Sequence, residues 1–237
     1  MHKSNSTYFS DLDVSRSHLV THLLSQGMPR VAANARNKLV LDPATGKPVP
    51  GSFGIGLGAV SCSFRREIAP YAPYEMWSRI LAWDRKWVYI ITHFVAGGKV
   101  RPTAWDGRRG GGGRVRPKTV AVGADGKEED FSKHVIATAL SKYVFKLGRF
   151  TVHPAIVLQE SGLLPERPGE GWRGGESGVG TPEDLGDVAE DGEWDWRRVE
   201  LERRKGMEYA ELFGALDGTN SLFDGGEGGA LGHFPVG

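Results

Sequence analysis

The chain has 237 residues, enough for one sizeable domain with appendages, and its 30 basic and 29 acidic side chains leave a formal net charge of +1. That balance creates no overall field that would attract nucleic acid or an anionic membrane. One cysteine excludes an internal disulfide framework and suits a reducing compartment. No apolar run approaches the roughly 20 residues that span a bilayer, and the first residues lack a signal-peptide pattern. We therefore expect a soluble, cytoplasmic protein without a membrane span.

The first predicted element is a long amphipathic helix that starts within a few residues of Met1 and ends near Gly27. At about 100° per residue its large apolar side chains gather on one arc, namely Tyr8, Phe9, Leu12, Leu19, Val20 and Leu23. Arg16 falls inside this arc, and Asp13 lies three residues before it. Because a buried charge needs a partner, we interpret these two residues as a structural ion pair.

Strand patterns follow a loop-like stretch at residues 30–53. Alternation and turn signals predict strands at 54–68, 74–83, 87–96 and 135–147. A short helix should begin at Pro154, where the proline is favourable at the first helical position. Residues 88–91 are apolar on both faces of their strand. Such a strand is central, or its second face is covered by another element or another subunit.

The main domain is predicted to span residues 1–164 and to contain a flexible insert at about 98–132. The insert holds a glycine run that cannot pack and a basic stretch at 101–118. Basic residues without interleaved aromatic residues are weak evidence for nucleic-acid binding. A solvated loop is therefore the preferred interpretation.

Residues 165–192 are rich in proline, glycine and acidic side chains, which predicts a disordered linker. An amphipathic helix at 193–217 is expected to dock back on the domain. It should be broken or kinked near Gly206, because glycine weakens a helix interior. The tail at 218–237 is predicted to be flexible.

Several short patterns have an ordinary structural interpretation. His18 and His22 lie one helical turn apart, but no third metal ligand is apparent, so a solvated helix side is favoured over a metal site. Asp11 and Asp13 diverge by about 200° on the helix and cannot serve one site as a carboxylate pair. Cys62 lies in a strand-like run, where a buried, inert thiol is the default and a nucleophile the alternative.

Three glycines alternate in the first predicted strand, at Gly54, Gly56 and Gly58. Alternating glycines fit a strand that meets close neighbours on one face. They do not match the spacing of a dinucleotide-binding loop.

The first residues carry a resemblance to a known family. The run His2-Lys3-Ser4-Asn5-Ser6-Thr7-Tyr8, followed by Asp13 and Arg16, resembles the start of the central helix in hotdog-fold acyl thioesterases. In the acyl-carrier-protein thioesterases of this superfamily a histidine is followed by asparagine three residues on and by tyrosine six residues on. His2, Asn5 and Tyr8 have the same spacing.

Further segments make the resemblance narrower. They are similar to thioesterase-like hotdog proteins that fungi encode in secondary-metabolite gene clusters, and to animal relatives of those proteins. The resemblance covers residues 2–160 and, more loosely, 194–216. The segments that carry it are Arg65-Arg66-Glu67-Ile68, Pro70-Tyr71, Tyr74-Glu75, Arg79 to Asp84, Lys86-Trp87 and Lys142 to Phe150.

The resemblance implies an α+β hotdog fold, in which an antiparallel sheet wraps around a central N-terminal helix. Members of the family have a strand before that helix and often an acidic residue shortly before the histidine. This chain begins at Met1 and His2, so we expect it to lack the family's first strand and that acidic residue. The departure implies either a shortened form of the protein or a loss of the chemistry.

The resemblance also implies roles for individual residues. His2 is the candidate general base and Asn5 the candidate that orients water or the thioester carbonyl, helped by unpaired N–H groups at the helix start. Ser6, Tyr8 and Asp11 are candidate substrate-binding residues. The non-catalytic alternative is that Asn5 caps the helix and His2 belongs to a mobile terminus.

Together these features predict an acyl thioesterase that acts on an acyl-CoA or a carrier-bound acyl or polyketide chain in fungal secondary metabolism. The acyl chain would enter an apolar tunnel between the helix and the sheet. We expect no cofactor, no metal and no nucleic-acid partner, and the family implies a homodimer. The alternative is a non-catalytic hotdog protein that binds acyl chains or a synthase partner, and a dehydratase is disfavoured because its usual histidine and acid are not recognisable.

Overall fold

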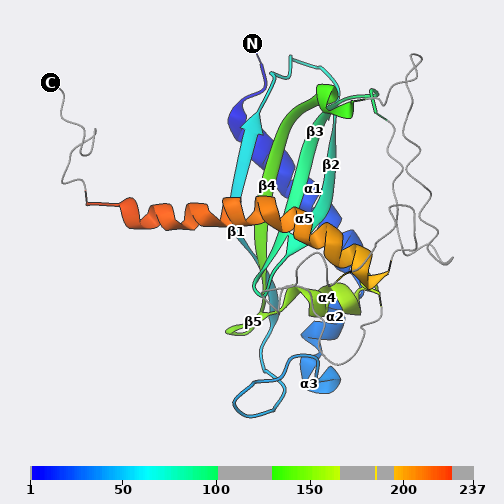
Figure 1. The fold of residues 1–237 in the computed structure, drawn as a ribbon, viewed down its shortest axis with the longest axis vertical. Helices are drawn as coiled ribbons and strands as arrows, with labels where there is room; N and C mark the ends of the chain where they lie inside the picture. Colours follow the sequence, from blue (N-terminus) through cyan, green and yellow to red (C-terminus); the bar gives the residue numbers. More distant parts are fainter. Residues whose placement is uncertain (1, 101–129, 166–184, 186–194, 226–237) are drawn as a thin grey trace.

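The computed structural model describes residues 2–100, 130–165, 185 and 195–225. Three layers make up the described chain. Helix α1 (Asn5–Leu24) packs on one face of an antiparallel sheet, here called the inner face, and helix α5 (Trp196–Ala215) crosses the opposite, outer face (Figure 1). A sheet that holds a long helix against one face is the hotdog arrangement that the resemblance implies.

The sheet has the strand order β1-β4-β3-β2, with every pair antiparallel. The strands are β1 (Phe53–Phe64), β2 (Tyr74–Trp83), β3 (Trp87–Ala96), β4 (Val135–Leu147) and the short β5 (Phe150–Val152), which pairs with the end of β4. The bounds predicted for β2, β3 and β4 are confirmed. Strand β1 is shorter than predicted, because Arg65 and Arg66 both bond the carbonyl of Ile136 instead of continuing the ladder.

The loop predicted at residues 30–53 is wrong in its first part. Helices α2 (Gly27–Ala32) and α3 (Asn34–Asn37) lie there, and α2 begins at Gly27, where the sequence predicts a helix end. A Cβ at Gly27 would lie 2.3 Å from Ser161 Oγ, just after helix α4 (Pro154–Glu160). Gly27 therefore serves the close packing of α2 on α4.

The inner face holds two apolar clusters separated by a polar band. Leu24 belongs to one cluster, with α4, and Tyr8 and Leu12 belong to the other. Between them Arg16, 1% exposed, pairs with Asp13 and donates from Nη1 to Ser141 Oγ at 2.7 Å. The interpretation of Asp13 and Arg16 as a structural pair is confirmed.

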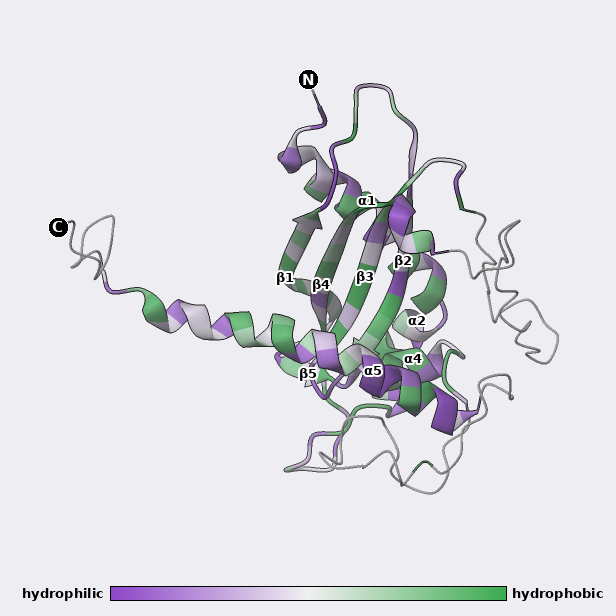
Figure 2. Ribbon diagram, turned by 45° about the horizontal axis from the view of Figure 1, so that its top comes forward, coloured by the Kyte–Doolittle hydropathy of each residue, from purple (hydrophilic) through white to green (hydrophobic). Residues whose placement is uncertain are grey.

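The outer face explains why residues 88–91 of β3 are apolar on both sides. Tyr89 is buried there against Ala210 and Phe213 of α5. The second face of β3 is thus covered by an element of the same chain, which is one of the alternatives that the pattern leaves open. The ribbon of α5 changes repeatedly between hydrophilic and hydrophobic residues, and hydrophobic residues recur along the strands (Figure 2).

Helix α5 runs without interruption through Gly206, so the predicted break at that residue is wrong. A Cβ at Gly206 would lie 2.3 Å from the carbonyl oxygen of Leu81 in β2. The glycine therefore allows the helix to approach the strand closely, and the packing outweighs the low helix propensity of glycine.

Ion pairs with at least one buried member anchor α5 near its start and beyond its end. Near its start Arg203 bonds Glu200 at 2.7 and 2.8 Å, and its Nη1 donates to the carbonyl of Trp83 at 2.9 Å. Beyond its end, in the 3-10 helix η3 (Leu216–Leu222), Asp217 accepts two bonds of 2.6 Å from Lys142 Nζ of β4. Lys142 is 2% exposed, so the pair fixes the end of the helix to the sheet.

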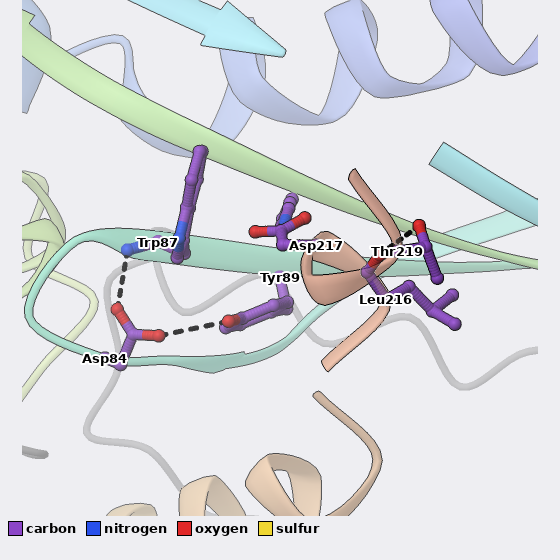
Figure 3. A network of polar contacts seen from close by, with 7 residues as sticks. Asp84, Trp87, Tyr89, Leu216, Asp217 and Thr219 are labelled. Carbon is purple, nitrogen blue, oxygen red and sulfur yellow. Dashed lines mark hydrogen bonds and ion pairs between the residues drawn. The ribbon is translucent and has the colours of Figure 1, made fainter. Parts of the chain in front are cut away.

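A network beside this anchor holds the turn between β2 and β3. Asp84 accepts bonds from the backbone N–H of Trp87 at 2.7 Å and from the Tyr89 hydroxyl at 3.0 Å, and Asp217 lies close to both rings (Figure 3). Burial, together with the charge of Asp84, raises the pKa of Tyr89. Its hydroxyl therefore stays a donor at all ordinary pH values.

The predicted insert, linker and tail fall largely on residues 101–129, 166–184, 186–194 and 226–237, which lie outside the described residues. The 3-10 helix η1 (Phe131–His134) leads into β4. None of the described helices has both the length and the apolar content that crossing a bilayer requires.

Candidate active site

A cleft of about 310 Å³ lies at the N-terminus of α1. The backbone N–H of Lys3 donates to the carbonyl of Ile68 at 3.0 Å, and this bond ties the segment before α1 to the segment after β1. The cleft is lined by His2, Lys3, Asn5, Tyr8, Phe64, Arg65, Arg66 and Glu67. Both predicted catalytic residues, His2 and Asn5, therefore lie on one cleft, together with the predicted substrate-binding residue Tyr8.

Glu67 supplies a carboxylate that the sequence patterns do not single out. His2 Nδ1 lies 3.7 Å from Glu67 Oε2, with about half of the histidine side chain exposed. A carboxylate beside one ring nitrogen can hold an imidazole with its other nitrogen free to accept a proton. In the sequence, Arg65-Arg66-Glu67 contributes only to the family resemblance, and no local signal shows that the end of β1 returns to the start of α1.

Asn5 is the first residue of α1 and is exposed, so it does not cap the helix. Ser4 occupies the N-cap position, but its side chain makes no cap bond and contacts Ser6 Oγ at 3.0 Å instead. The backbone N–H groups at the start of the helix thus have no side-chain cap. Such groups, at the positive end of the helix dipole, favour a bound anion or a polarised carbonyl.

Tyr8 forms the floor of the cleft. Its ring is 2% exposed and contacts Phe64 at a centroid distance of 5.0 Å and Phe94 at 4.9 Å. Burial raises the pKa of the Tyr8 hydroxyl, which therefore stays protonated. Lys3 Nζ lies 5.5 Å from the centre of this ring, within the range of a cation–π contact.

The Asp11 carboxylate is already engaged by neighbouring residues. It accepts a bond of 2.7 Å from the Tyr74 hydroxyl, and Lys3 Nζ lies 2.7 Å away. Burial tends to lower the pKa of Lys3, but the bonds to Asp11 and Tyr74 outweigh it and raise that pKa. Burial, with Asp11, likewise raises the pKa of Tyr74. Of the predicted substrate-binding residues, Asp11 and Ser6 do not line the cleft.

Two arginines give one wall of the cleft a positive edge. Arg65 Nη1 donates to the carbonyl of Ser132 and Arg66 Nη2 to that of Val135, each at 3.3 Å. Both side chains are exposed. Guanidinium groups with free donors are well suited to phosphate oxygens.

A second cavity lies between α1 and the sheet, where the sequence predicts an apolar tunnel. Its volume is about 10 Å³, which is the space of roughly one water molecule. Its lining surface is wholly apolar and comes from Leu19, Val20, Leu23, Leu24, Ile55, Ile80, Val88, Ile90, Tyr143 and Phe145. The helix and the sheet are thus in contact here, so an acyl chain would have to separate them.

The remaining candidates from the sequence are not gathered into a site. His18 and His22 are exposed on α1. Within the described residues, histidine, cysteine and carboxylate side chains form no group of three that could hold a metal ion. Cys62 is partly buried, and burial raises the pKa of its thiol, which disfavours the reactive thiolate.

The chain is similar in sequence to several known proteins. The chain is 37% identical over 234 residues to thioesterase poxG of Penicillium oxalicum, covering 94% of the chain and 64% of that protein. It is 37% identical to the probable thioesterase atnL of Emericella nidulans, covering 99% of the chain and 69% of that protein. Thioesterase lcsJ of Purpureocillium lilacinum is also 37% identical, over 87% of the chain and 59% of its own length.

No family model matches the chain. Among solved structures, a gentisyl-coenzyme A thioesterase superposes with a TM-score of 0.37 at 12% identity, over 67% of this chain and 87% of its own. The probable thioesterase YbaW of Escherichia coli gives a TM-score of 0.39, also at 12% identity, over 68% and 84%. These superpositions are loose, and the assignment rests on the sequence relatives.

An antiparallel sheet on a long helix, with a polar cleft at the start of that helix, defines the class as a hotdog protein of the thioesterase type. The chain belongs to the family of fungal thioesterases that includes poxG and atnL. It spans about two thirds of the length of these relatives.

Proposed function

We propose that this protein hydrolyses acyl thioesters in the cleft at the N-terminus of α1. The observation that carries the proposal is the meeting of His2, Asn5 and Glu67 on one cleft in a chain whose relatives are thioesterases. A histidine beside a helix N-terminus supports the proposal, because the imidazole could act as a general base and the helix N–H groups could polarise a thioester carbonyl.

The helix start would stabilise the transition state. Attack on the carbonyl carbon places negative charge on its oxygen, and N–H groups aimed at that oxygen are worth about 2.7 to 4 kcal/mol each in comparable sites. The uncapped first turn at Asn5 offers such groups. The Asn5 side-chain amide, exposed at the same place, would orient the carbonyl or the attacking water.

His2 would act as the general base. Its imidazole takes a proton from water as the water attacks, and later returns a proton to the leaving thiolate. Glu67, 3.7 Å from Nδ1, would hold the ring and stabilise the imidazolium that forms. Glu67 would thus contribute a carboxylate from the wall of the cleft opposite His2.

The carrier of the acyl group would lie along the wall of the cleft that Arg65 and Arg66 form. Coenzyme A and the phosphopantetheine arm of a carrier protein both carry phosphate, and Arg65 and Arg66 present exposed guanidinium groups at the mouth of the cleft. The acyl chain would run over Tyr8 toward the apolar seam between α1 and the sheet. We further propose that the protein works as a cytoplasmic homodimer in fungal secondary metabolism, as the family resemblance implies.

Thiol release from a panel of acyl-CoA thioesters of increasing chain length tests the proposal. The chain should release free thiol, and His2→Ala should lower kcat by about 10²- to 10⁴-fold. His18→Ala, an exposed histidine on the other part of the same helix, is the matched control and should leave the rate unchanged. Acyl-CoA binding without any thiol release would refute the proposal and favour a non-catalytic acyl-binding protein.

A further inference from the structure

The polar band on the inner face lies across the route proposed for the acyl chain. Tyr8, at the floor of the cleft, belongs to the apolar cluster on one side of the band, and Leu19 and Val20 line the apolar seam on the other side. Arg16 lies between them on α1, about 16 Å along the helix from Asn5 at 1.5 Å per residue. An acyl chain that reaches the seam from the cleft therefore has to pass Arg16.

Hydroxyl groups continue this band on the strands. Ser15 Oγ of α1 lies 2.7 Å from Ser78 Oγ of β2, which in turn lies 2.7 Å from Thr92 Oγ1 of β3. Thr92 and Ser141 of β4 are each 1% exposed. Polar groups are costly to bury, and a route for a plain hydrocarbon chain needs none of them. The band therefore suits a chain that brings polar atoms of its own.

The Arg16 guanidinium has one donor that the described residues leave without an acceptor. Its Nη1 donates to Ser141 Oγ and its Nη2 pairs with Asp13, whereas Nε is buried and has no hydrogen-bond partner within the described part of the chain. The centre of the guanidinium lies 5.7 Å from the centre of the Tyr143 ring, and Tyr143 lines the apolar seam. The unpaired donor thus lies beside the route of the acyl chain.

An acceptor from outside the chain explains this donor best. A buried donor without an acceptor costs more stability than an ordinary hydrogen bond contributes, and a charged donor costs more still. Such groups are rare in native proteins. The neighbouring cavity of about 10 Å³ has an apolar lining, so it offers a water molecule none of the polar partners that a buried water needs. A guanidinium only donates, and a methylene chain has no acceptor, but a keto or hydroxyl oxygen has one.

We propose that Arg16 determines specificity by selecting acyl chains that carry an oxygen substituent, a keto or hydroxyl group, where the chain crosses the polar band. The oxygen accepts the hydrogen of Nε, and the apolar remainder of the chain enters the seam. The substituent lies well away from the thioester, because Arg16 is about three turns of α1 beyond Asn5. The inference rests on the acyl route proposed above and names the class of substrate.

Binding of paired ligands tests this selection without requiring turnover. The ligands are non-hydrolysable acyl-CoA thioethers with a plain medium or long chain, and the same chains with one keto group placed at successive carbons. By isothermal titration calorimetry, the keto ligand whose oxygen reaches Arg16 should bind at least about tenfold more tightly than the plain one, because hydrogen bonds to charged groups are among the stronger ones. Arg16→Met should abolish this preference. Equal binding of the plain ligand and every keto ligand by the unmodified chain would overturn the proposal.

Ser141→Ala separates the Nε donor from the general polarity of the band. This variant removes a buried hydroxyl and the acceptor of Nη1 but leaves Nε in place, so the preference for the keto ligand should remain. His18→Ala, at an exposed position of the same helix, is the matched control and should bind both ligands as the unmodified chain does. A preference that Ser141→Ala loses as fully as Arg16→Met would overturn the assignment to Nε.

Thiol release from the corresponding thioesters distinguishes this inference from the proposed function. The value of kcat/KM should show the same preference for the keto chain, and Arg16→Met should remove it. A chain that binds keto ligands through Arg16 but releases no thiol would refute the proposed function and leave the selectivity standing. Hydrolysis that is equally fast for plain and keto chains would support the proposed function and overturn the selectivity.

Discussion

The two faces of the sheet are each covered by a 20-residue helix, but the helices are held by different means. On the inner face α1 buries apolar side chains, and its one buried charge, Arg16, pairs with Asp13, whose side chain is 70% exposed. On the outer face both members of the Glu200–Arg203 pair in α5 are nearly buried, at 5% and 8% exposure, and Arg203 also donates to the carbonyl of Trp83. The Lys142–Asp217 pair resembles the inner one, because its carboxylate is 59% exposed. The inner helix therefore depends mainly on apolar burial, whereas the outer helix combines apolar burial with one charge pair, Glu200–Arg203, whose members cannot be solvated when the partner is lost.

The largest expected difference comes from removing one arginine on each face. Arg203→Met leaves Glu200 buried, with Arg204, 2.9 Å away, as its remaining partner among the described residues, and should lower the free energy of unfolding by about 3 kcal/mol. Arg16→Met leaves Asp13 in water and should cost about 1 kcal/mol or less. Urea denaturation of the two variants measures the difference, and equal costs would show that the two faces are held alike.

A matched pair of glycines in α5 sharpens the comparison. Gly206→Ala introduces a Cβ 2.3 Å from the Leu81 carbonyl and should destabilise the protein by about 1 to 3 kcal/mol. Gly214→Ala meets its nearest atom, the Tyr89 hydroxyl, only at 3.8 Å and should stabilise the helix by about 0.5 to 1 kcal/mol. Thermal unfolding measures the change in stability of both variants. If the two substitutions both raised or both lowered the stability, the close approach of α5 to β2 would be contradicted.

The smallest expected effect is a pH dependence of stability that arises from His93, a residue of β3 that contacts β4. Burial, aided by the charge of Arg79, lowers the pKa of His93, whose Nδ1 lies 3.1 Å from Thr138 Oγ1. As the pH falls below the ordinary histidine value of 6.5, the unfolded chain takes up a proton that the folded chain does not, so stability falls. The loss ends once the pH passes below the folded pKa, and its slope cannot exceed about 1.4 kcal/mol per pH unit. Urea midpoints at neutral and mildly acidic pH should differ less in His93→Gln, and an unchanged pH dependence in that variant would contradict this assignment.

The comparison of the two faces also shows which features the sequence could predict. The bounds of β2, β3 and β4 follow from alternation and turn residues, which are local signals. The long first helix ends at Leu24, near the predicted Gly27, although Gly27 itself begins α2. The predicted break at Gly206 is wrong, and both positions are glycine because a Cβ would meet a distant segment. The apolar pattern of residues 88–91 indicates that a cover is needed, but cannot show that α5 provides it.

The candidate site likewise contains residues that the sequence could predict and residues that it could not. His2, Asn5 and Tyr8 lie within about two helical turns of one another along the chain, so a spacing motif in the sequence is enough to group them. Glu67 lies 65 positions further along the chain from His2 and reaches the cleft only because β1 ends beside the start of α1. Likewise, no local pattern could show that Asp11 is already engaged by Lys3 and Tyr74.

The most direct test of a catalytic site at the start of α1 is kcat/KM for thiol release by the Asn5→Ala variant. Loss of an oxyanion-type donor should lower this value by about 10²- to 10³-fold, with the fold and thermal midpoint unchanged because Asn5 is exposed. A variant that hydrolyses acyl-CoA as fast as the unmodified chain would contradict the assignment of the active site to this cleft.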